Sequence, residues 1–306
     1  MSISCILCKS ADTYKTGSID TAQLSALYKK RAGTAVERFF HQPTVELYTC
    51  RHCDLIFYWP QAIGDGKFYD ELQRYSGYYL KEKAEFVEAA KFIASHEHVL
   101  EIGCGEGLFT DYIKCKSYTG LEFSEDAIKK AKQKGLNVIN ESLEHHAATH
   151  EQLYDVVCYF QVLEHVPDPG SFIAHSLKCL KPGGKLLVAV PSEDSFIKNV
   201  VNFYLNMPPH HASRWTDKAL KNVAALFNLE VAELFHEPLH SVHKKFYIKT
   251  MLYKKMMRLR GGQARAVDNR LTSKLIYGLS HVISLLPISS KNVTGQSVLV
   301  TYRKKS

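Results

Sequence analysis

The sequence contains no run of about 18 apolar residues, the length that a membrane-spanning helix needs, although 45% of its 306 residues are hydrophobic. The first residues, Met1 to Ser10, include polar side chains and two cysteines in place of the charged start and long apolar segment of a signal peptide. Internal repeats and low-complexity tracts are also absent. We therefore expect neither an integral membrane protein nor a repeat protein, but a cytoplasmic globular one.

Size and charge set wide limits on what the chain can do. A chain of 306 residues can bury a complete α/β core and still carry an accessory module. The formal net charge of +8 is compatible with nucleic acid, an anionic membrane surface or an acidic substrate, and favours none of them. The function must therefore be argued from motifs.

Four of the eight cysteines form two Cys-x-x-Cys pairs, Cys5 with Cys8 and Cys50 with Cys53. In a reducing compartment such pairs indicate a metal before a disulfide, and four thiolates suit a tetrahedral structural zinc. The stretch between the pairs is longer than the loop that usually separates the two cysteine pairs of a zinc ribbon. Residues 16–40, with a helix over Thr21 to Arg31, must therefore form an insertion between the pairs. Four buried or free cysteines, or a redox dithiol, are the alternatives, and His52 is a conceivable substitute ligand.

A glycine-rich turn follows the short apolar strand predicted over Val99 to Ile102. Its glycines, Gly103, Gly105 and Gly107, allow the backbone to turn sharply and to approach a ligand closely. A helix predicted from Leu108 would present unpaired N–H groups to that ligand. The pattern predicts a cofactor-binding loop, with an ordinary strand-to-helix turn as the alternative.

The next strand, predicted over residues 117–121, ends at Glu122. An acidic residue at this point, about twenty residues after a glycine loop, accepts hydrogen bonds from the ribose hydroxyls of an adenosine. Phe123 is placed to lie against the adenine, and Ser124 is the expected N-cap of a helix that reaches Gln133. A solvated surface glutamate is the alternative interpretation of Glu122.

Two groups of histidines are candidates for chemistry on the acceptor side. Glu164 and His165 follow a strand predicted over residues 154–160, and a carboxylate beside an imidazole suits general-base work or metal coordination. His210 and His211 follow the strand predicted over residues 185–190 and lie in a segment typical of an acceptor-binding lid. Both groups could instead only hold their loops together. A third group, the histidines at 145, 146 and 150, lacks carboxylates at ligand spacing and is interpreted as plain surface.

The order of these motifs, together with Leu163 to Pro169 and the turn Lys181 to Gly184, resembles the class I S-adenosylmethionine (SAM) methyltransferases. The resemblance covers roughly residues 78–240 and the C-terminal strand, and it is strongest to the small-molecule branch that includes the ubiquinone-biosynthesis O-methyltransferases. The N-terminal cysteine segment resembles the zinc-ribbon module of bacterial methyltransferases that act on sugars and other glycan or secondary-metabolite precursors.

This resemblance implies a set of residues around SAM. The methionine part would lie along the glycine loop, the ribose on Glu122, and the adenine and sulfonium beside the ends of the strands predicted over residues 136–140 and 154–160. The residues expected to bind the cofactor are Glu101, Gly103, Cys104, Gly105, Gly107, Glu122, Phe123, Ser124, Ser142, Leu143, Phe160 and Gln161. The ubiquinone branch has a glutamate at the position of Gln161, and its loss puts catalytic metal binding in doubt if that glutamate is a ligand.

We therefore predict a Rossmann-like seven-stranded α/β sheet with helices on both faces. The expected parts are a zinc ribbon over residues 1–63, a SAM-binding core over 64–240, a helical insert over 241–290, and a last strand with a basic tail over 291–306. The insert, with helices over 244–260 and 271–286, opens the hairpin of the last two strands. It is either ordinary packing or a cap for an anionic or lipid-linked acceptor at a membrane surface.

The expected function is transfer of a methyl group from SAM to an oxygen or carbon of a small-molecule, glycan or lipid-precursor acceptor. The candidates for proton transfer are Glu164, His165, His210 and His211. An RNA or other nucleic-acid methyltransferase is not favoured, because the strand predicted over residues 154–160 is not followed by the Asn/Asp-Pro-Pro-aromatic signature of base amino-group methylation. A protein methyltransferase and a non-catalytic SAM-binding protein stay open, as does the oligomeric state.

Overall fold

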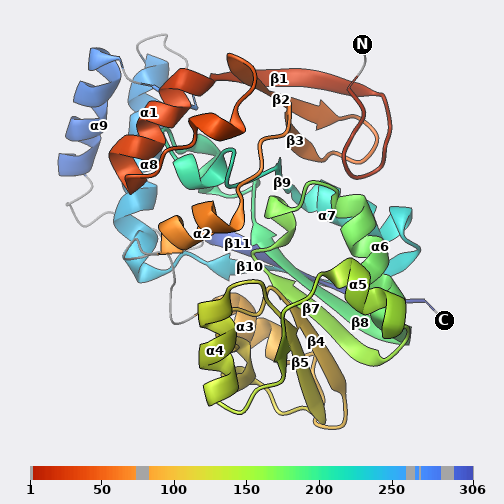
Figure 1. The fold of residues 1–306 in the computed structure, drawn as a ribbon. Coiled ribbons are helices and arrows are strands. Elements are labelled where there is room, and N and C mark those ends of the chain that lie inside the picture. The colour runs from red at the N-terminus through yellow and green to blue at the C-terminus, as the bar shows by residue number, and fades with distance from the viewer. Residues whose placement is uncertain (1–2, 74–82, 260–265, 269, 284–292, 306) are drawn as a thin grey trace.

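A computed structural model describes residues 3–73, 83–259, 266–268, 270–283 and 293–305 of the chain. In this part of the chain the strands form two sheets, a large one of seven strands and a small one of four. Figure 1 shows the small sheet above the large one, with β9 between them. No helix in the described ranges is long and apolar enough to cross a membrane.

The large sheet confirms the predicted Rossmann-like fold class. Its strand order is β10-β11-β8-β7-β4-β5-β6. The strands are β4 (His98–Ile102), β5 (Ser117–Leu121), β6 (Val138–Ile139), β7 (Tyr154–Phe160), β8 (Leu180–Pro191), β10 (Leu229–Pro238) and β11 (Thr294–Lys304). All neighbours pair in parallel except β11, which is antiparallel to both β8 and β10. The last two strands therefore form the expected hairpin, opened by a long insert.

Helices cover both faces of this sheet because β7, apart from Asp155 near its start, is apolar and alternates its side chains between two cores. Val157 and Tyr159 pack in the core that includes residues of α5 (Leu143–Thr149), α6 (Pro169–Cys179) and α7 (Asp217–Leu226). Val156, Cys158 and Phe160 pack in the opposite core, against α3 (Ala84–Ala90) and the 3-10 helix η2 (Leu108–Tyr112). A further helix, α4 (Glu125–Gln133), packs beside β6.

Two helices of the core are shorter than the sequence predicted. The helix expected from Leu108 is only the five-residue η2, because strand β5 must begin again at Ser117 and leaves little chain between the two. From one apolar face, the sequence also predicts a helix over residues 82–95. The helix observed there is α3, which ends at Ala90, and the i→i+3 bonds of Phe92 and Ile93 then tighten the chain. The sequence also makes Tyr78 and Tyr79 candidates for closing over the cofactor, and both lie in residues 74–82, outside the described residues.

The small sheet joins the N-terminal segment to the core. Its order is β1-β2-β3-β9, formed by β1 (Thr13–Asp20), β2 (Thr44–Cys50), β3 (Ile56–Trp59) and β9 (Ser213–Arg214). The predicted N-terminal helix is α1 (Thr21–Ala32), which Asp20 caps by accepting a hydrogen bond from the backbone N–H of Gln23. Because β9 comes from a loop of the core, the N-terminal segment holds that loop through backbone hydrogen bonds.

Three more helices complete the set of α-helices in the described residues. The first is α2 (Gly66–Gln73), and the long insert supplies α8 (Lys244–Leu259) and α9 (Leu271–Ile283). The two predicted helices of the insert are thus confirmed within the described residues. Val267, from the connection between them, packs in the same apolar cluster as Leu24 and Tyr28 of α1.

Candidate active site

The candidate site lies where strand order reverses in the large sheet. After β4 the chain continues to β5 and β6 on one side, whereas β7 and β8 lie on the other. Ligands bind outside the carboxyl ends of the strands at such a switch point. The glycine loop follows β4, Glu122 follows β5, and Glu164 with His165 follows β7, so the three predicted motifs end at one edge of the sheet.

The glycine loop needs glycine for two different reasons. All three glycines have left-handed backbone conformations, with φ of 67° at Gly103, 55° at Gly105 and 73° at Gly107. At Gly103 a Cβ would also lie 2.6 Å from Cγ2 of Val162, because the loop packs directly on the segment that carries Glu164. At Gly105 a Cβ would meet nothing within 4 Å. The space above Gly105 is therefore open to a ligand.

Glu122 is fixed in front of this loop by three backbone donors. The N–H groups of Gly105, Phe123 and Ser124 each donate to its carboxylate at 2.8 Å. The ring of Phe123 beside it is 69% exposed and therefore accessible to a ligand. A preoriented carboxylate beside an exposed ring suits the predicted adenosine, and the contacts of Glu122 and Phe123 with a cofactor stay predictions.

Glu101 lies behind the loop, at the end of β4. It is buried and accepts a hydrogen bond of 2.6 Å from the hydroxyl of Tyr118. Burial raises the pKa of its carboxyl to about 7, and the Tyr118 hydrogen bond and the charge of Lys83 oppose this rise. The thiol of Cys104 packs against Gly120, where a Cβ would lie 2.5 Å from Sγ, so only the backbone of Cys104 remains for a cofactor.

The other predicted cofactor residues also have structural roles. Ser124 caps α4 and Ser142 caps α5, each through its hydroxyl oxygen, and Leu143 is buried in the core. Phe160 packs against Phe86 and Phe109. Gln161 has a φ of 57°, and its side-chain amide donates to Oγ of Ser297 at 3.2 Å. Contacts of these residues with a cofactor stay predictions.

On the acceptor side, the fold brings the two predicted groups of histidines together. His165 ends the 3-10 helix η3 (Leu163–His165), and His210 and His211 lie between the 3-10 helix η5 (Tyr204–Asn206) and β9. The ring of His165 meets those of His210 and His211 edge-on, at centroid distances of 4.6 and 4.8 Å. The four catalytic candidates, Glu164 and the three histidines, come from segments far apart in the sequence and thus form one cluster.

Burial controls the charge of this cluster. It lowers the pKa of His165 to about 4 and lowers those of His210 and His211 well below the ordinary value, so all three imidazoles are neutral at pH 7. Burial also raises the pKa of the Glu164 carboxyl to about 8. Its Oε2 atom has no hydrogen-bonding partner in the part of the chain that the structure describes.

Tyr69 of α2 is a member of the cluster that the sequence did not single out. Its hydroxyl donates to the backbone oxygen of His210 and lies 3.3 Å from Nδ1 of His165, and its ring meets His165 edge-on. The sequence offers four tyrosines between residues 69 and 79 and no signal that distinguishes this one. Only the packing of α2 against the loop after η5 identifies it.

The interpretation of the third histidine group as plain surface is wrong for His146. This side chain is fully buried on α5, where its Nδ1 is hydrogen-bonded to the carboxylate of Glu141 and its Nε2 lies 2.9 Å from the hydroxyl of Tyr154. The sequence could not show that α5 turns this histidine toward the sheet. Because both ring nitrogens already have partners, His146 is a structural histidine.

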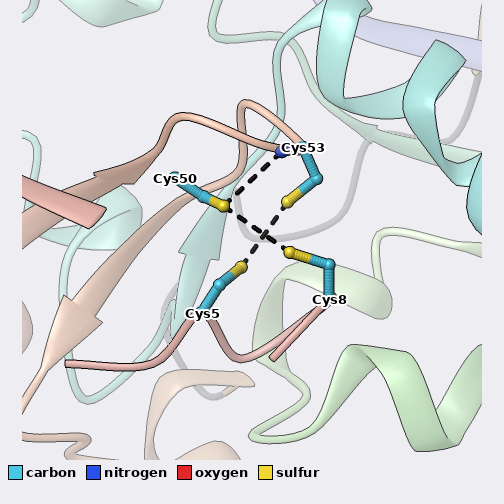
Figure 2. Close-up of side chains that lie close together, drawn as sticks. All are labelled: Cys5, Cys8, Cys50 and Cys53. Atoms are coloured by element: carbon cyan, nitrogen blue, oxygen red, sulfur yellow. Dashed lines mark hydrogen bonds between the residues drawn. The ribbon is translucent and has the colours of Figure 1, made fainter. Parts of the chain in front are cut away.

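The four cysteines of the N-terminal module converge as the spacing predicted, and Figure 2 shows their sulfur atoms pointing toward one another. The sulfurs of Cys5 and Cys53 are 3.5 Å apart, as are those of Cys8 and Cys50. Zinc–sulfur bonds of about 2.3 Å place tetrahedral ligands about 3.8 Å apart, so a small outward movement accommodates the ion. The residues present therefore fit a closed structural zinc site.

The parallel sheet, the glycine loop at its switch point and the acidic tip of β5 define a Rossmann-like domain that binds an adenosine-containing cofactor. The chain belongs to the methyltransferase domain family, whose model matches residues 70–234, more than half of its length.

Curated relatives share part of this domain. The ubiquinone biosynthesis O-methyltransferase of Proteus mirabilis is 30% identical over 152 residues, which are 45% of this chain and 59% of that protein. The enzyme of the same name from Klebsiella pneumoniae is 38% identical over 96 residues, 29% of this chain and 40% of that protein. The chain thus spans about half the length of the curated relatives it matches.

Among solved structures, a SAM-dependent methyltransferase from Archaeoglobus fulgidus aligns with 78% of this chain and 100% of its own, with a TM-score of 0.48 and 20% identity.

Proposed function

We propose that this protein transfers a methyl group from SAM to an oxygen or carbon of a small-molecule, glycan or lipid-precursor acceptor. The observation that carries the proposal is the placement of the two half-sites. The open glycine loop with Glu122 lies at one end of the switch point, and the Glu164–histidine cluster lies next to it through the contact of Gly103 with Val162. Membership of the methyltransferase domain family supports the reaction class.

The residues divide the work between binding and proton removal. When bound, SAM supplies an electrophilic methyl group on a sulfonium; the acceptor atom bonds to the methyl carbon as the carbon–sulfur bond breaks. Glu122 and the loop hold the donor, so that donor and acceptor meet in line. His165, which is neutral at pH 7 and whose Nε2 lies 3.8 Å from Oε1 of Glu164, is placed to receive the proton that the acceptor loses.

We further propose that the Cys5, Cys8, Cys50 and Cys53 cluster binds a structural zinc ion and that the zinc module positions the acceptor side of the site. Its strand β3 pairs with β9, and the hydroxyl of Tyr58 on β3 donates to the backbone oxygen of Asn206 at 2.8 Å. The backbone N–H of Tyr58 also donates to Ala212, the residue after His211. An ordered module therefore fixes the backbone on both sides of the two histidines.

The insert supports an acceptor with an apolar part. Four apolar side chains on α9 are exposed by half or more, at Leu271, Leu275, Leu279 and Val282, a spacing that places them along one stripe of the helix. The preceding α8 is basic, with Lys244, Lys245, Lys249, Lys254, Lys255 and Arg258. An apolar stripe beside a basic helix fits a lipid-linked or anionic acceptor at a membrane surface.

The test is a transfer assay with radiolabelled SAM, purified full-length protein and a fractionated cell extract. Label in the small polar, glycan or lipid fraction would support the proposal, whereas label confined to RNA or protein would overturn the acceptor class. Glu122→Ala serves as the control for the cofactor site and should weaken SAM binding at least tenfold. If Glu122→Ala transferred label at the wild-type rate, with the same dependence on SAM concentration, the assigned donor site would be contradicted.

A further inference from the structure

Helix α9 exposes its leucines and buries its serines, the reverse of what a helix on the surface of a globular protein usually does. Leu271 and Leu275 are 71% and 66% exposed, whereas Ser273 and Ser280 are 3% and 0% exposed. The exposed apolar side chains recur at intervals of three or four residues, so they lie along one side of the helix. This apolar stripe consists of Leu271, Leu275, Leu279 and Val282.

The orientation of α9 is fixed by contacts on its opposite face. Ile276 packs in one apolar cluster with Tyr253 and Met257 of α8. The two buried serines have partners, because Ser273 donates to Asp268 at 2.7 Å and Ser280 donates to the backbone oxygen of Ile276 at 2.8 Å. The apolar stripe therefore points away from α8, and Figure 1 shows α9 at the outer edge of the molecule. An exposed apolar surface of this kind marks a site of interaction.

The insert that carries the stripe also carries the net charge of the protein. Residues 241–290 contain ten lysines and arginines and one aspartate, a formal charge of +9, whereas the rest of the chain contains 29 basic and 30 acidic residues. Among the described residues, no lysine or arginine of α8 forms an ion pair with a carboxylate, and Lys254, Lys255 and Arg258 are exposed. These cations are available to an anionic surface outside the protein.

An anionic lipid bilayer matches both features at once. Apolar side chains of an amphipathic helix enter the boundary between headgroups and acyl chains, while lysines and arginines bind the headgroups. A second copy of this chain would bring two inserts of charge +9 together, which like-charge repulsion disfavours. A nucleic acid would match the charge but offers no apolar phase for four aliphatic side chains. The combination therefore favours a membrane over these two partners.

The insert is attached at the edge of the large sheet where the candidate site lies. The 3-10 helix η4 (Phe196–Asn199) follows the carboxyl end of β8, and the rings of Phe246 and Tyr247 meet the ring of Phe196 edge-on at 5.6 and 5.4 Å. Lys254 also donates to Oδ1 of Asn199 at 2.7 Å. The insert is thus connected to this edge of the sheet through a directly packed segment.

We propose that the insert docks this protein on anionic phospholipid bilayers. The apolar stripe of α9 inserts at the headgroup boundary, and the exposed lysines and arginines of the insert contact the headgroups. Because salt screens exposed charges over about 10 Å at 0.1 M, docking weakens as the salt concentration rises. The use of docking to reach an acceptor held in the membrane rests on the proposed methyl transfer; docking itself does not.

The experiment measures co-sedimentation of full-length protein with vesicles of phosphatidylcholine, prepared with and without phosphatidylglycerol. We expect binding at least about tenfold tighter to the anionic vesicles, since each lysine or arginine near such a surface contributes about 1 kcal/mol. Leu275→Ser combined with Leu279→Ser should weaken this binding at least about tenfold, because two buried leucines are lost. Leu153→Ser changes a leucine that is 44% exposed just before β7 and should bind as wild type does.

A second pair of substitutions tests the charge. Lys255→Ser combined with Lys274→Ser should weaken binding to the anionic vesicles and flatten its dependence on salt. Lys129→Ser combined with Lys132→Ser removes the same charge from exposed positions on α4 and should have a smaller effect. The melting temperature and SAM affinity of each variant, measured on the same samples, show that it is folded.

Four results would overturn the inference: no binding to either kind of vesicle, equal binding to both, wild-type binding by the leucine pair, or equal effects of the two lysine pairs. A wild-type dimer that the leucine pair converts to a monomer would also overturn it, because a second copy would then cover the apolar stripe. An RNA gel shift that the leucine pair abolishes would likewise assign the surface to another partner. The vesicle assay contains no SAM and no acceptor, so its failure leaves the proposed methyl transfer standing.

Discussion

Replacing Gly105 with alanine tests whether the open space above the glycine loop belongs to the cofactor. Gly105 has a φ of 55°, and a Cβ there would meet nothing within 4 Å. The substitution therefore adds backbone strain without a steric clash. A left-handed conformation costs a residue with a Cβ about 1–2 kcal/mol. In the absence of ligand, we expect Gly105→Ala to lower the free energy of unfolding by about that amount and to leave the fold intact.

Gly183 offers a matched control. It also has a positive φ, 73°, and a Cβ on it would likewise meet nothing within 4 Å, but it lies near the amino end of β8, away from the loop. The free energy of unfolding of Gly183→Ala should therefore fall by the same amount, about 1–2 kcal/mol. Only Gly105→Ala places a methyl group where the loop faces the ligand. We expect its SAM affinity to fall at least tenfold, about 1.4 kcal/mol, with wild-type affinity in Gly183→Ala.

The assay combines denaturant unfolding without ligand and calorimetric titration with SAM, both applied to the two variants and the wild type. Equal SAM affinity in Gly105→Ala and Gly183→Ala would refute the assignment of this space to the cofactor. A loss of stability several times larger in Gly105→Ala than in Gly183→Ala would show instead that the loop packs against the chain itself.

Three further predictions concern other parts of the site. Burial raises the pKa of Glu101 from 4.5 to about 7, so this group stabilises the fold fully below about pH 4.5 and loses that contribution as the pH rises to about 7. Measured by urea unfolding, the free energy of unfolding of Glu101→Gln should therefore rise relative to wild type by up to about 3 kcal/mol between pH 5 and pH 8. A difference that does not depend on pH would contradict this. Tyr69→Phe removes the hydroxyl between His165 and His210 and should lower kcat several-fold with unchanged SAM affinity, while Tyr48→Phe, whose hydroxyl contacts Glu46, should leave both unchanged. Cys50→Ser should lose the thiolate-bound metal ion and have a lower melting temperature than wild type. Because β3 pairs with β9, the substitution should also reduce methyl transfer more than SAM binding. Full transfer by a zinc-free variant would show that the module does not position the histidines.

Local signals were sufficient for most of the core. Apolar strands separated by glycine, capping and turn residues predicted the strand order along the chain, the glycine loop and the acidic tip at Glu122. Ser124 caps α4 as predicted, and α1, α8 and α9 lie where the sequence placed helices, because caps and periodicity act within a few residues of one another. The Cys-x-x-Cys spacing likewise predicted that four sulfurs would converge.

Only the tertiary structure decided how the acceptor side is assembled. The meeting of His165 with His210 and His211 depends on β9 leaving the core to pair with β3, and the role of Tyr69 depends on α2 packing against the same loop. The burial of His146 depends on which face of α5 meets the sheet. The sequence alone determined the methyltransferase-type core and its candidate residues, because hydrophobic periodicity, turns and caps are local. Which of those residues touch is set by pairings between segments far apart in the chain, and no local pattern encodes them.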